Sequence, residues 1–148
     1  MTTAVPTTVP NLVSLAPRYL LDTNICIYLM KHQPPQVVER FGRCRVGEVG
    51  VSAITAAELE FGVAASGSDQ QSNREALDRF LAEVPVAPFD RAAALAYGPV
   101  RLQTRERRRD ALDKLIAAHA LALNAILITN NPRDFQAYSG LLIENWLE

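Results

Sequence analysis

The segment Tyr19-Leu20-Leu21-Asp22-Thr23-Asn24 places three consecutive apolar residues directly before an acid and two further polar residues. An uninterrupted apolar run of this kind indicates a strand that is buried on both faces of a sheet. Thr23 and Asn24 are residue types that cap helices, so a helix is expected over residues 25–31. A buried strand followed at once by a helix is typical of α/β folds, and it places Asp22 at the C-terminal end of that strand.

Short apolar runs and amphipathic segments continue to alternate along the rest of the chain. Further strands are expected over residues 49–54, 84–89, 125–129 and 141–143. Further helices are expected over residues 36–41, from Thr55 onward, and over residues 73–83, 90–105 and 110–123. Strands separated by helices favour parallel pairing, so the predicted class is α/β with a central parallel β-sheet flanked by α-helices.

The bulk composition predicts one globular domain without a membrane span. The chain has 148 residues, of which 49% are hydrophobic, and a net charge of −1. Residues 1–17 are rich in Thr, Val and Pro and are predicted to form a flexible leader, which leaves residues 18–148 for the domain. The longest apolar stretch, residues 115–129, is too short to cross a bilayer. Cys26 and Cys44 lack the spacing of a metal site, so a reducing, cytoplasmic location is expected.

Acidic and amide side chains follow the predicted strands. Asp22 closes the first strand, Glu58 lies one turn into the helix after the second, and Asp113 lies in the first turn of its own helix. Asn131 and Asp134 follow the fourth strand. Functional groups of open α/β sheets gather beyond the C-terminal strand ends, so these side chains can meet there. Clustered carboxylates stay ionised only beside a cation, and all-oxygen ligands favour Mg²⁺ or Mn²⁺, which can activate water and clamp a phosphodiester.

Structural roles compete with the catalytic role for several of these residues. Thr55-Ala-Ala-Glu58 has the spacing of a capping box, in which Glu58 would fold back onto its own helix. Asp113 can be a plain helix-start acid, and Asp110, one turn earlier on the same face, can take its place in the site. His119 is predicted to be a packed or hydrogen-bonded core histidine rather than a catalytic group.

An arginine cluster lies between the last two predicted helices. Its five members fall within nine residues: Arg101, Arg105, Arg107, Arg108 and Arg109. One interpretation is a solvated helix face or turn. The other is a surface that steers phosphates toward the carboxylates, in which Arg105 and residues 107–109 would contact RNA.

Five segments, taken together, resemble the PIN-domain family and, within it, the VapC-type toxins of bacterial toxin–antitoxin pairs. The matching segments are Tyr19–Asn24, Ser52–Gly62, Leu112–Leu121, Ile128–Phe135 and Gly140–Trp146. They occur in the order and at the separations usual for the family, and they cover nearly all of residues 18–148. The stretch beginning at Arg107 departs from the family, because it replaces a commoner turn that contains Gly and Pro.

The resemblance implies a PIN fold and a Mg²⁺- or Mn²⁺-dependent endoribonuclease that inhibits translation and growth. It also implies a homodimer that a VapB-type antitoxin neutralises, in a heterotetramer or larger assembly. The family's first three acids correspond to Asp22, Glu58 and Asp113, with Asp22 and Asp113 expected to hold the metal. The fourth acid is Asp134 or is replaced by Asn131, which stands where the family often has an acid.

Supporting polar roles follow from the same resemblance: Thr23, Asn24 and Thr129 match positions that orient the acids. Two other functions compete with the nuclease. A phosphatase with Asp22 as nucleophile would need a second acid where Asn24 stands. A catalytically weak PIN scaffold that binds RNA or a protein without cleavage is favoured by Asn131. The RNA that is cut and the identity of the antitoxin are not predicted.

Overall fold

The computed structural model describes residues 16–107 and 109–148, so the predicted leader lies, except for residues 16 and 17, outside the described residues. A five-stranded sheet with the order β3-β2-β1-β4-β5 forms the centre of the fold, and every strand pair is parallel. Its strands are β1 (Tyr19–Leu21), β2 (Val49–Ser52), β3 (Val86–Ala87), β4 (Ile126–Ile128) and β5 (Leu142–Glu144). The predicted α/β class with a parallel sheet is therefore confirmed.

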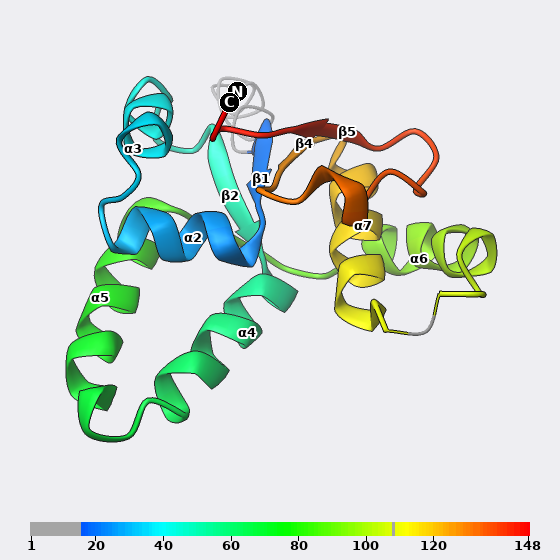
Figure 1. The fold of residues 1–148 in the computed structure, drawn as a ribbon. Helices are drawn as coiled ribbons and strands as arrows, with labels where there is room; N and C mark the ends of the chain where they lie inside the picture. Colours follow the sequence, from blue (N-terminus) through cyan, green and yellow to red (C-terminus); the bar gives the residue numbers. More distant parts are fainter. Residues whose placement is uncertain (1–15, 108) are drawn as a thin grey trace, which may run out of the picture.

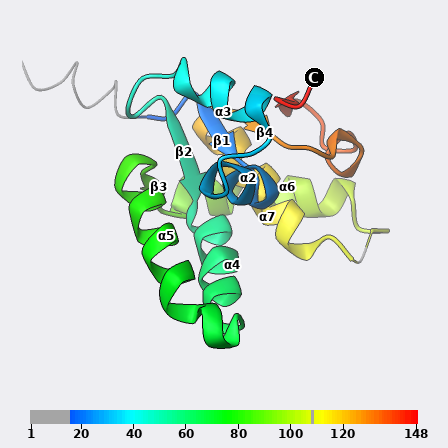
Figure 2. The same cartoon turned by 60° about the vertical axis from the view of Figure 1, so that its left-hand side comes forward.

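Helices flank the sheet on both sides (Figure 1). They are α2 (Thr23–Met30), α3 (Pro35–Gly42), α4 (Ala53–Ala64), α5 (Gln70–Glu83), α6 (Arg91–Gln103) and α7 (Ala111–Leu123), with short 3-10 turns η2 (Gly67–Asp69) and η3 (Pro132–Asp134). Helices α4 and α5 extend away from the sheet and are joined by η2 at their far end (Figure 2).

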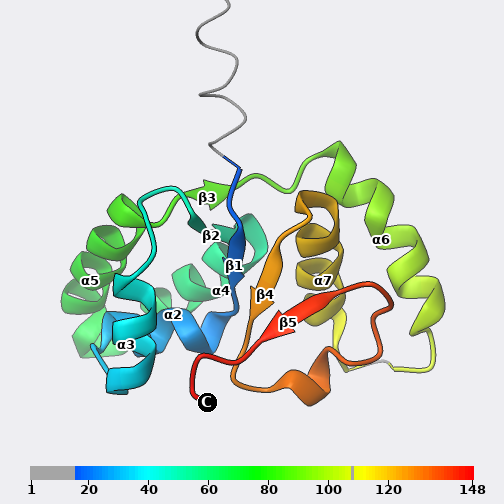
Figure 3. The ribbon, with the colours of Figure 1, turned by 90° about the horizontal axis from the view of Figure 1, so that it is seen from above.

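The central strand β1 divides two hydrophobic cores. Successive strand side chains point to opposite faces. Tyr19 and Leu21 therefore pack with α2, α3 and α5, whereas Leu20 packs with residues of α6 and α7. Figure 3 shows these two helix groups on either side of β1 and β4. All three residues of β1 are buried, as the uninterrupted apolar run predicted.

The chain order creates a switch point between β1 and β4. From β1 the chain builds outward through β2 to the edge strand β3, and it then crosses to the other side of β1 to add β4 and β5. Leu21 is in register with Ile128, and the amide of Asp22 donates to the carbonyl of Ile128 at 2.8 Å. In open α/β sheets the crevice at such a point, beyond the C-terminal strand ends, is where ligands bind.

The helix expected over residues 73–83 begins earlier, at Gln70, and two predicted helix caps are wrong. Strand β2 ends at Ser52 rather than residue 54, and the Ser52 hydroxyl caps α4 by accepting from the amide of Ile54 at 3.0 Å. Thr55 is thus a buried residue inside the helix and not its cap. Helix α2 is capped by Asp22, whose carboxylate accepts from the amide of Thr23 at 2.8 Å, so Thr23 is already the first helical residue.

Other sequence predictions are confirmed. Asp90 caps α6 by accepting from an amide in its first turn at 3.1 Å, and Asn124 ends α7 in the left-handed conformation with φ of 56°. His119 is a core histidine whose Nδ1 lies 2.7 Å from the Ser52 hydroxyl. Both cysteines are free thiols. No helix of the described residues is long and apolar enough to cross a membrane.

Candidate active site

Asp22 occupies the switch point between β1 and β4. One carboxylate oxygen accepts from the amide of Thr23 at 2.8 Å, and the other accepts from the Thr129 hydroxyl, at the end of β4, at 2.9 Å. Burial raises the pKa of Asp22, the two hydrogen bonds oppose this effect, and the charge of Asp134 adds to it. The carboxylate is therefore held rigidly in a site where its negative charge is poorly solvated.

Glu58 reaches the same site from α4. The Thr23 hydroxyl donates to Glu58 Oε1 at 2.7 Å, so the Glu58 side chain is hydrogen-bonded to the first residue of α2. This contact replaces the predicted capping box, in which Glu58 would have turned back toward Thr55. Thr23 connects two of the acids, because its amide contacts Asp22 and its hydroxyl contacts Glu58.

Asp113 shows how strongly negative charge accumulates here. Its carboxylate is half-buried in the first turn of α7, and its pKa is raised to about 6. Burial is the largest cause, and the charges of Asp22, Asp134, Asp110 and Glu58 add to it in that order. Among the described residues, no hydrogen-bond donor contacts the Asp113 carboxylate to offset these effects.

Asn131 and Asp134 are hydrogen-bonded to each other. The Asn131 side-chain amide donates to an oxygen of Asp134 at 2.9 Å, and its backbone amide donates to the Thr129 hydroxyl at 3.1 Å. Because that hydroxyl in turn donates to Asp22, a continuous chain of hydrogen bonds links Asp134 to Asp22.

Asn24 lies at the rim of the site. Its side-chain amide donates to the Asn130 side chain at 3.3 Å, and Asn130 donates to the Tyr28 hydroxyl at 3.3 Å. Asn130 was missed in the sequence, although its place directly after β4 was a usable signal. The contact fastens the loop after β4 onto α2.

Asp110 does not take the place of Asp113. It accepts from the Tyr138 hydroxyl at 2.8 Å and pairs with Arg107 at 3.1 Å and Lys114 at 3.4 Å. Asp110 is therefore engaged in an ion cluster, which favours Asp113 over Asp110 as the acid of the site. Lys114 was also missed, although its position four residues after Asp110 on one helix was the signal for such a pair.

The arginine cluster separates into different environments. Arg107 turns inward, where its guanidinium donates to the backbone carbonyl of Asp134 at 3.2 Å, whereas Arg105 and Arg109 are exposed. Arg108 lies outside the described residues. Contact of these arginines with RNA stays a prediction. Arg107 differs from Arg105 and Arg109 because its guanidinium already donates to a backbone carbonyl of the protein.

The donor set fits a hard divalent cation. Every acid at the switch point offers carboxylate oxygens. Burial and the charges of the neighbouring acids raise the pKa of Asp113, and a bound cation would offset both effects. Within the described residues, no three acid, histidine or cysteine side chains are close enough together to hold an ion as they stand. A cation here would therefore draw the carboxylates of Asp22 and Asp113 toward each other.

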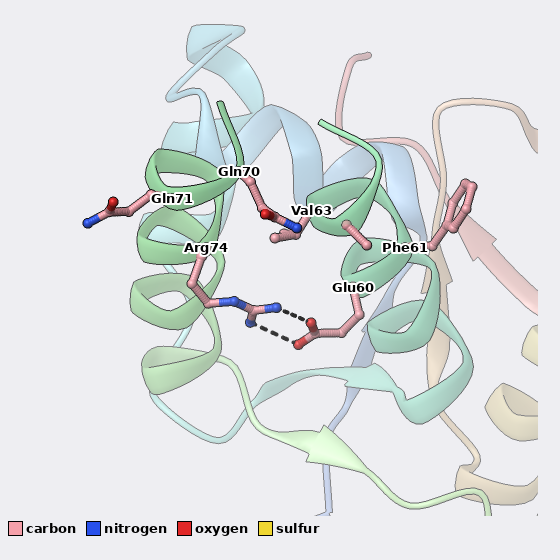
Figure 4. Close-up of a pocket in the computed structure, with 7 residues that line it drawn as sticks. Glu60, Phe61, Val63, Gln70, Gln71 and Arg74 are labelled. Carbon is pink, nitrogen blue, oxygen red and sulfur yellow. Dashed lines mark hydrogen bonds and ion pairs between the residues drawn. The ribbon is translucent and has the colours of Figure 1, made fainter. Parts of the chain in front are cut away.

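A hollow of about 630 Å³ lies between the outer ends of α4 and α5, and none of the acids of the switch point lines it. Figure 4 shows its polar centre, where the Arg74 guanidinium and the Glu60 carboxylate form a forked pair. Each charge is neutralised by the other, and Phe61 points away from the pair. The hollow offers no free group for catalysis.

Known proteins resemble this chain in sequence and in fold. The PIN domain model matches residues 19–141. The chain belongs to the PIN-domain family. This PIN-domain chain is 34% identical over 131 residues to the tRNA(fMet)-specific endonuclease VapC of Shigella flexneri. The matched region covers 87% of this chain and 98% of that relative. The family predicted from five sequence segments, including its VapC-type branch, is thereby confirmed.

Solved structures confirm the PIN fold. The DNA-bound VapBC complex of Salmonella typhimurium contains a chain with a TM-score of 0.80 and 31% identity, which covers 88% of this chain and 98% of that one. The VapBC2 complex of Rickettsia felis, bound to a DNA fragment from its promoter, gives a TM-score of 0.77 and 33% identity, covering 86% of this chain and 98% of that one.

Proposed function

We propose that this PIN-domain chain is an endoribonuclease that depends on Mg²⁺ or Mn²⁺ and acts as the toxin of a toxin–antitoxin pair. The observation that carries the proposal is the grouping of Asp22, Glu58, Asp113 and Asp134 around the switch point, where burial, together with the charges of the other acids, raises the pKa of Asp113 to about 6. Crowding of like charges costs stability, and it is found mainly at functional sites. A divalent cation together with a phosphodiester is the ligand pair that suits these carboxylates. The ribonuclease names of its relatives support the same function.

Each acid has a distinct role in the proposal. Asp22 and Asp113 hold the cation, which when bound would neutralise charge on the phosphodiester. Glu58 is held through Oε1 by Thr23, which leaves its other oxygen free to accept a proton from the attacking water. Asp134 completes the negative site, and Asn131 fixes its orientation.

The proposed partner is a VapB-type antitoxin. Relatives of 31% and 33% identity were solved as VapBC complexes bound to DNA. By analogy, this chain would form a homodimer and assemble with its antitoxin as a heterotetramer or larger complex, in the cytoplasm, where release of the toxin would halt translation and growth.

The decisive experiment is incubation of antitoxin-free protein with total RNA and, separately, with initiator tRNA, because the Shigella flexneri relative is named for tRNA(fMet). Reactions contain Mg²⁺, Mn²⁺ or EDTA. Discrete cuts that need the metal and disappear in Asp22→Asn are expected. Asp69→Asn is the matched control, because Asp69 is exposed and its side chain caps no helix. Full activity of Asp22→Asn would refute the assignment of the site.

A non-cleaving scaffold is the second candidate, and the amide at Asn131 in place of a family acid favours it. Intact RNA after long incubation of folded, antitoxin-free protein with either metal would support the scaffold. The phosphatase function predicts instead a phosphorylated Asp22, which mass spectrometry of protein treated with a phosphate analogue would detect.

A further inference from the structure

A basic hollow lies beside α6 and α7, apart from the acids of the switch point. It measures about 450 Å³, and its lining consists of Tyr97, Arg101, Arg105, Arg107, Ala111 and Lys114. Four of these side chains are cationic and none is acidic. In a chain whose net charge is −1, a hollow lined in this way indicates a site for an anionic ligand.

Two of the four cations are already committed to the protein. Lys114 is buried, donates to the backbone carbonyl of Thr104 at 3.0 Å and pairs with Asp110. Arg107 also pairs with Asp110 and donates to the carbonyl of Asp134. These two residues therefore form a fixed positive wall of the hollow.

The other two cations are available to a ligand. Arg101 is exposed and forms no ion pair within the described residues. Arg105 has one partner, Glu106, at 3.9 Å, and both side chains are largely exposed, at 72% and 93%. An exposed pair of this length contributes little and is readily exchanged for a phosphate.

Tyr97 adds a flat aromatic surface. It precedes Arg101 by four residues on α6, so the two side chains lie on the same face of the helix. Tyr97 is half-buried, and no aromatic or cationic side chain of the described residues stacks on its ring. An aromatic ring beside free arginines is the combination that binds single-stranded nucleic acid, through base stacking and phosphate contacts.

One wall of the hollow contacts the turn that carries Asp134. Arg107 lines the hollow and holds the backbone of Asp134, and Lys114 follows Asp113 in the same helical turn. The contact between Arg107 and Asp134 thus places the hollow next to the turn that carries one of the acids.

We propose that this hollow is a subsite for one nucleotide of the RNA next to the phosphodiester that is cut, with Arg101 and Arg105 on its phosphate and Tyr97 against its base. The inference rests on the proposed ribonuclease function, since it takes the ligand to be RNA. It divides the arginine cluster into a positioning member, Arg107, and ligand-binding members.

Binding is measured separately from cleavage, with wild-type protein in EDTA and a fluorescein-labelled single-stranded RNA of mixed sequence. Arg101→Gln/Arg105→Gln is expected to weaken binding about tenfold or more. It should also flatten the dependence of log K on log salt by about 0.7, because both arginines contact one phosphate and each neutralised phosphate of a single strand contributes about 0.7. Arg79→Gln/Arg91→Gln is the matched control, since it removes two exposed arginines elsewhere.

The tyrosine is tested in the same assay. Tyr97→Leu is expected to weaken binding about five- to hundredfold through loss of stacking, whereas Tyr97→Phe keeps the ring and the affinity. Thermal unfolding of each variant checks that it folds. Equal weakening of RNA binding by the two arginine double variants would overturn the inference. So would unchanged RNA binding by Arg101→Gln/Arg105→Gln together with loss of its binding to a polyglutamate peptide, because that result would assign the hollow to an acidic protein segment.

The outcome is distinguishable from failure of the proposed function. Loss of RNA binding in Arg101→Gln/Arg105→Gln supports the subsite even if wild-type protein cuts no RNA with any metal. Conversely, metal-dependent cleavage by wild type, with binding that is insensitive to Arg101 and Arg105, refutes the subsite and leaves the ribonuclease intact.

Discussion

Removal of the charge at Asp113 should stabilise the metal-free protein while abolishing its cleavage of RNA. Burial and the charges of Asp22, Asp134, Asp110 and Glu58 raise the pKa of Asp113 from 3.8 to about 6 in the folded state. The ionised carboxylate is therefore unfavourable in the fold, and Asp113→Asn relieves this without changing the side-chain shape.

The magnitude follows from the difference between the folded and unfolded pKa values. A change from 3.8 to about 6 corresponds to at most about 3 kcal/mol. Asp113 is only half-buried, so solvent screening reduces the expected gain to about 1–2 kcal/mol. The folded state binds the proton more tightly than the unfolded state, so wild-type stability falls as pH rises from about 4 to 6. The advantage of Asp113→Asn should accordingly be full above pH 6 and shrink toward pH 4.

The assay is urea unfolding in EDTA at several pH values, for wild type, Asp113→Asn and the exposed control Asp69→Asn. A stabilisation confined to Asp113→Asn and decreasing from pH 7.5 to pH 4 is expected. Saturating Mg²⁺ should stabilise wild type more than the variant, because a ligand that binds only the folded state stabilises it. The reasoning is refuted if Asp113→Asn is no more stable than wild type at pH 7.5, or if its advantage does not change with pH.

Three further predictions concern the fold and the metal. Asp110→Ala leaves the buried ammonium of Lys114 with carbonyl partners only. It should lower the free energy of unfolding, measured in urea, by about 3 kcal/mol, and an unchanged value would show that the ion cluster is not stabilising. Ser52→Ala removes the cap of α4 and the partner of His119 and should cost about 2 kcal/mol, with a loss below 0.5 kcal/mol contradicting both roles. EDTA should stop RNA cleavage and added Mn²⁺ should restore it, so cleavage that persists in EDTA would exclude a metal requirement.

The order of elements was predictable because the apolar pattern was unambiguous. The run Tyr19–Leu21 predicted a buried strand with Asp22 at its C-terminal end, and the strand order then shows that this end lies at the switch point. The boundary of β2 was not predictable in the same way. Ile54 and Thr55 are β-branched and extend the strand pattern, but the Ser52 hydroxyl starts a helix there, and packing of that helix overrides the local preference.

Side-chain partners were the least predictable part of the site. Glu58 had an equally good local partner in its own helix, and only the packing of α2 against α4 brings the Thr23 hydroxyl within 2.7 Å of it. Asp110 and Asp113 lie on the same face of α7, and the sequence does not distinguish them. The distinction arises because Lys114, Arg107 and Tyr138 converge on Asp110 alone.

The amide at position 131 limits the negative charge of the site. An acid at position 131 would place another negative charge beside Asp134, in a site that already raises the pKa values of Asp22 and Asp113. The amide instead donates a hydrogen bond to Asp134 and, through its backbone, continues the chain of hydrogen bonds via Thr129 to Asp22. At position 131 the site therefore has a hydrogen-bond donor in place of a further negative charge, and this donor orients the carboxylate of Asp134. Asn131→Asp should therefore raise the pKa of Asp113 further, which NMR titration of the side-chain carboxyl carbon would detect, and an unchanged titration would show that position 131 is electrostatically separate from the acids.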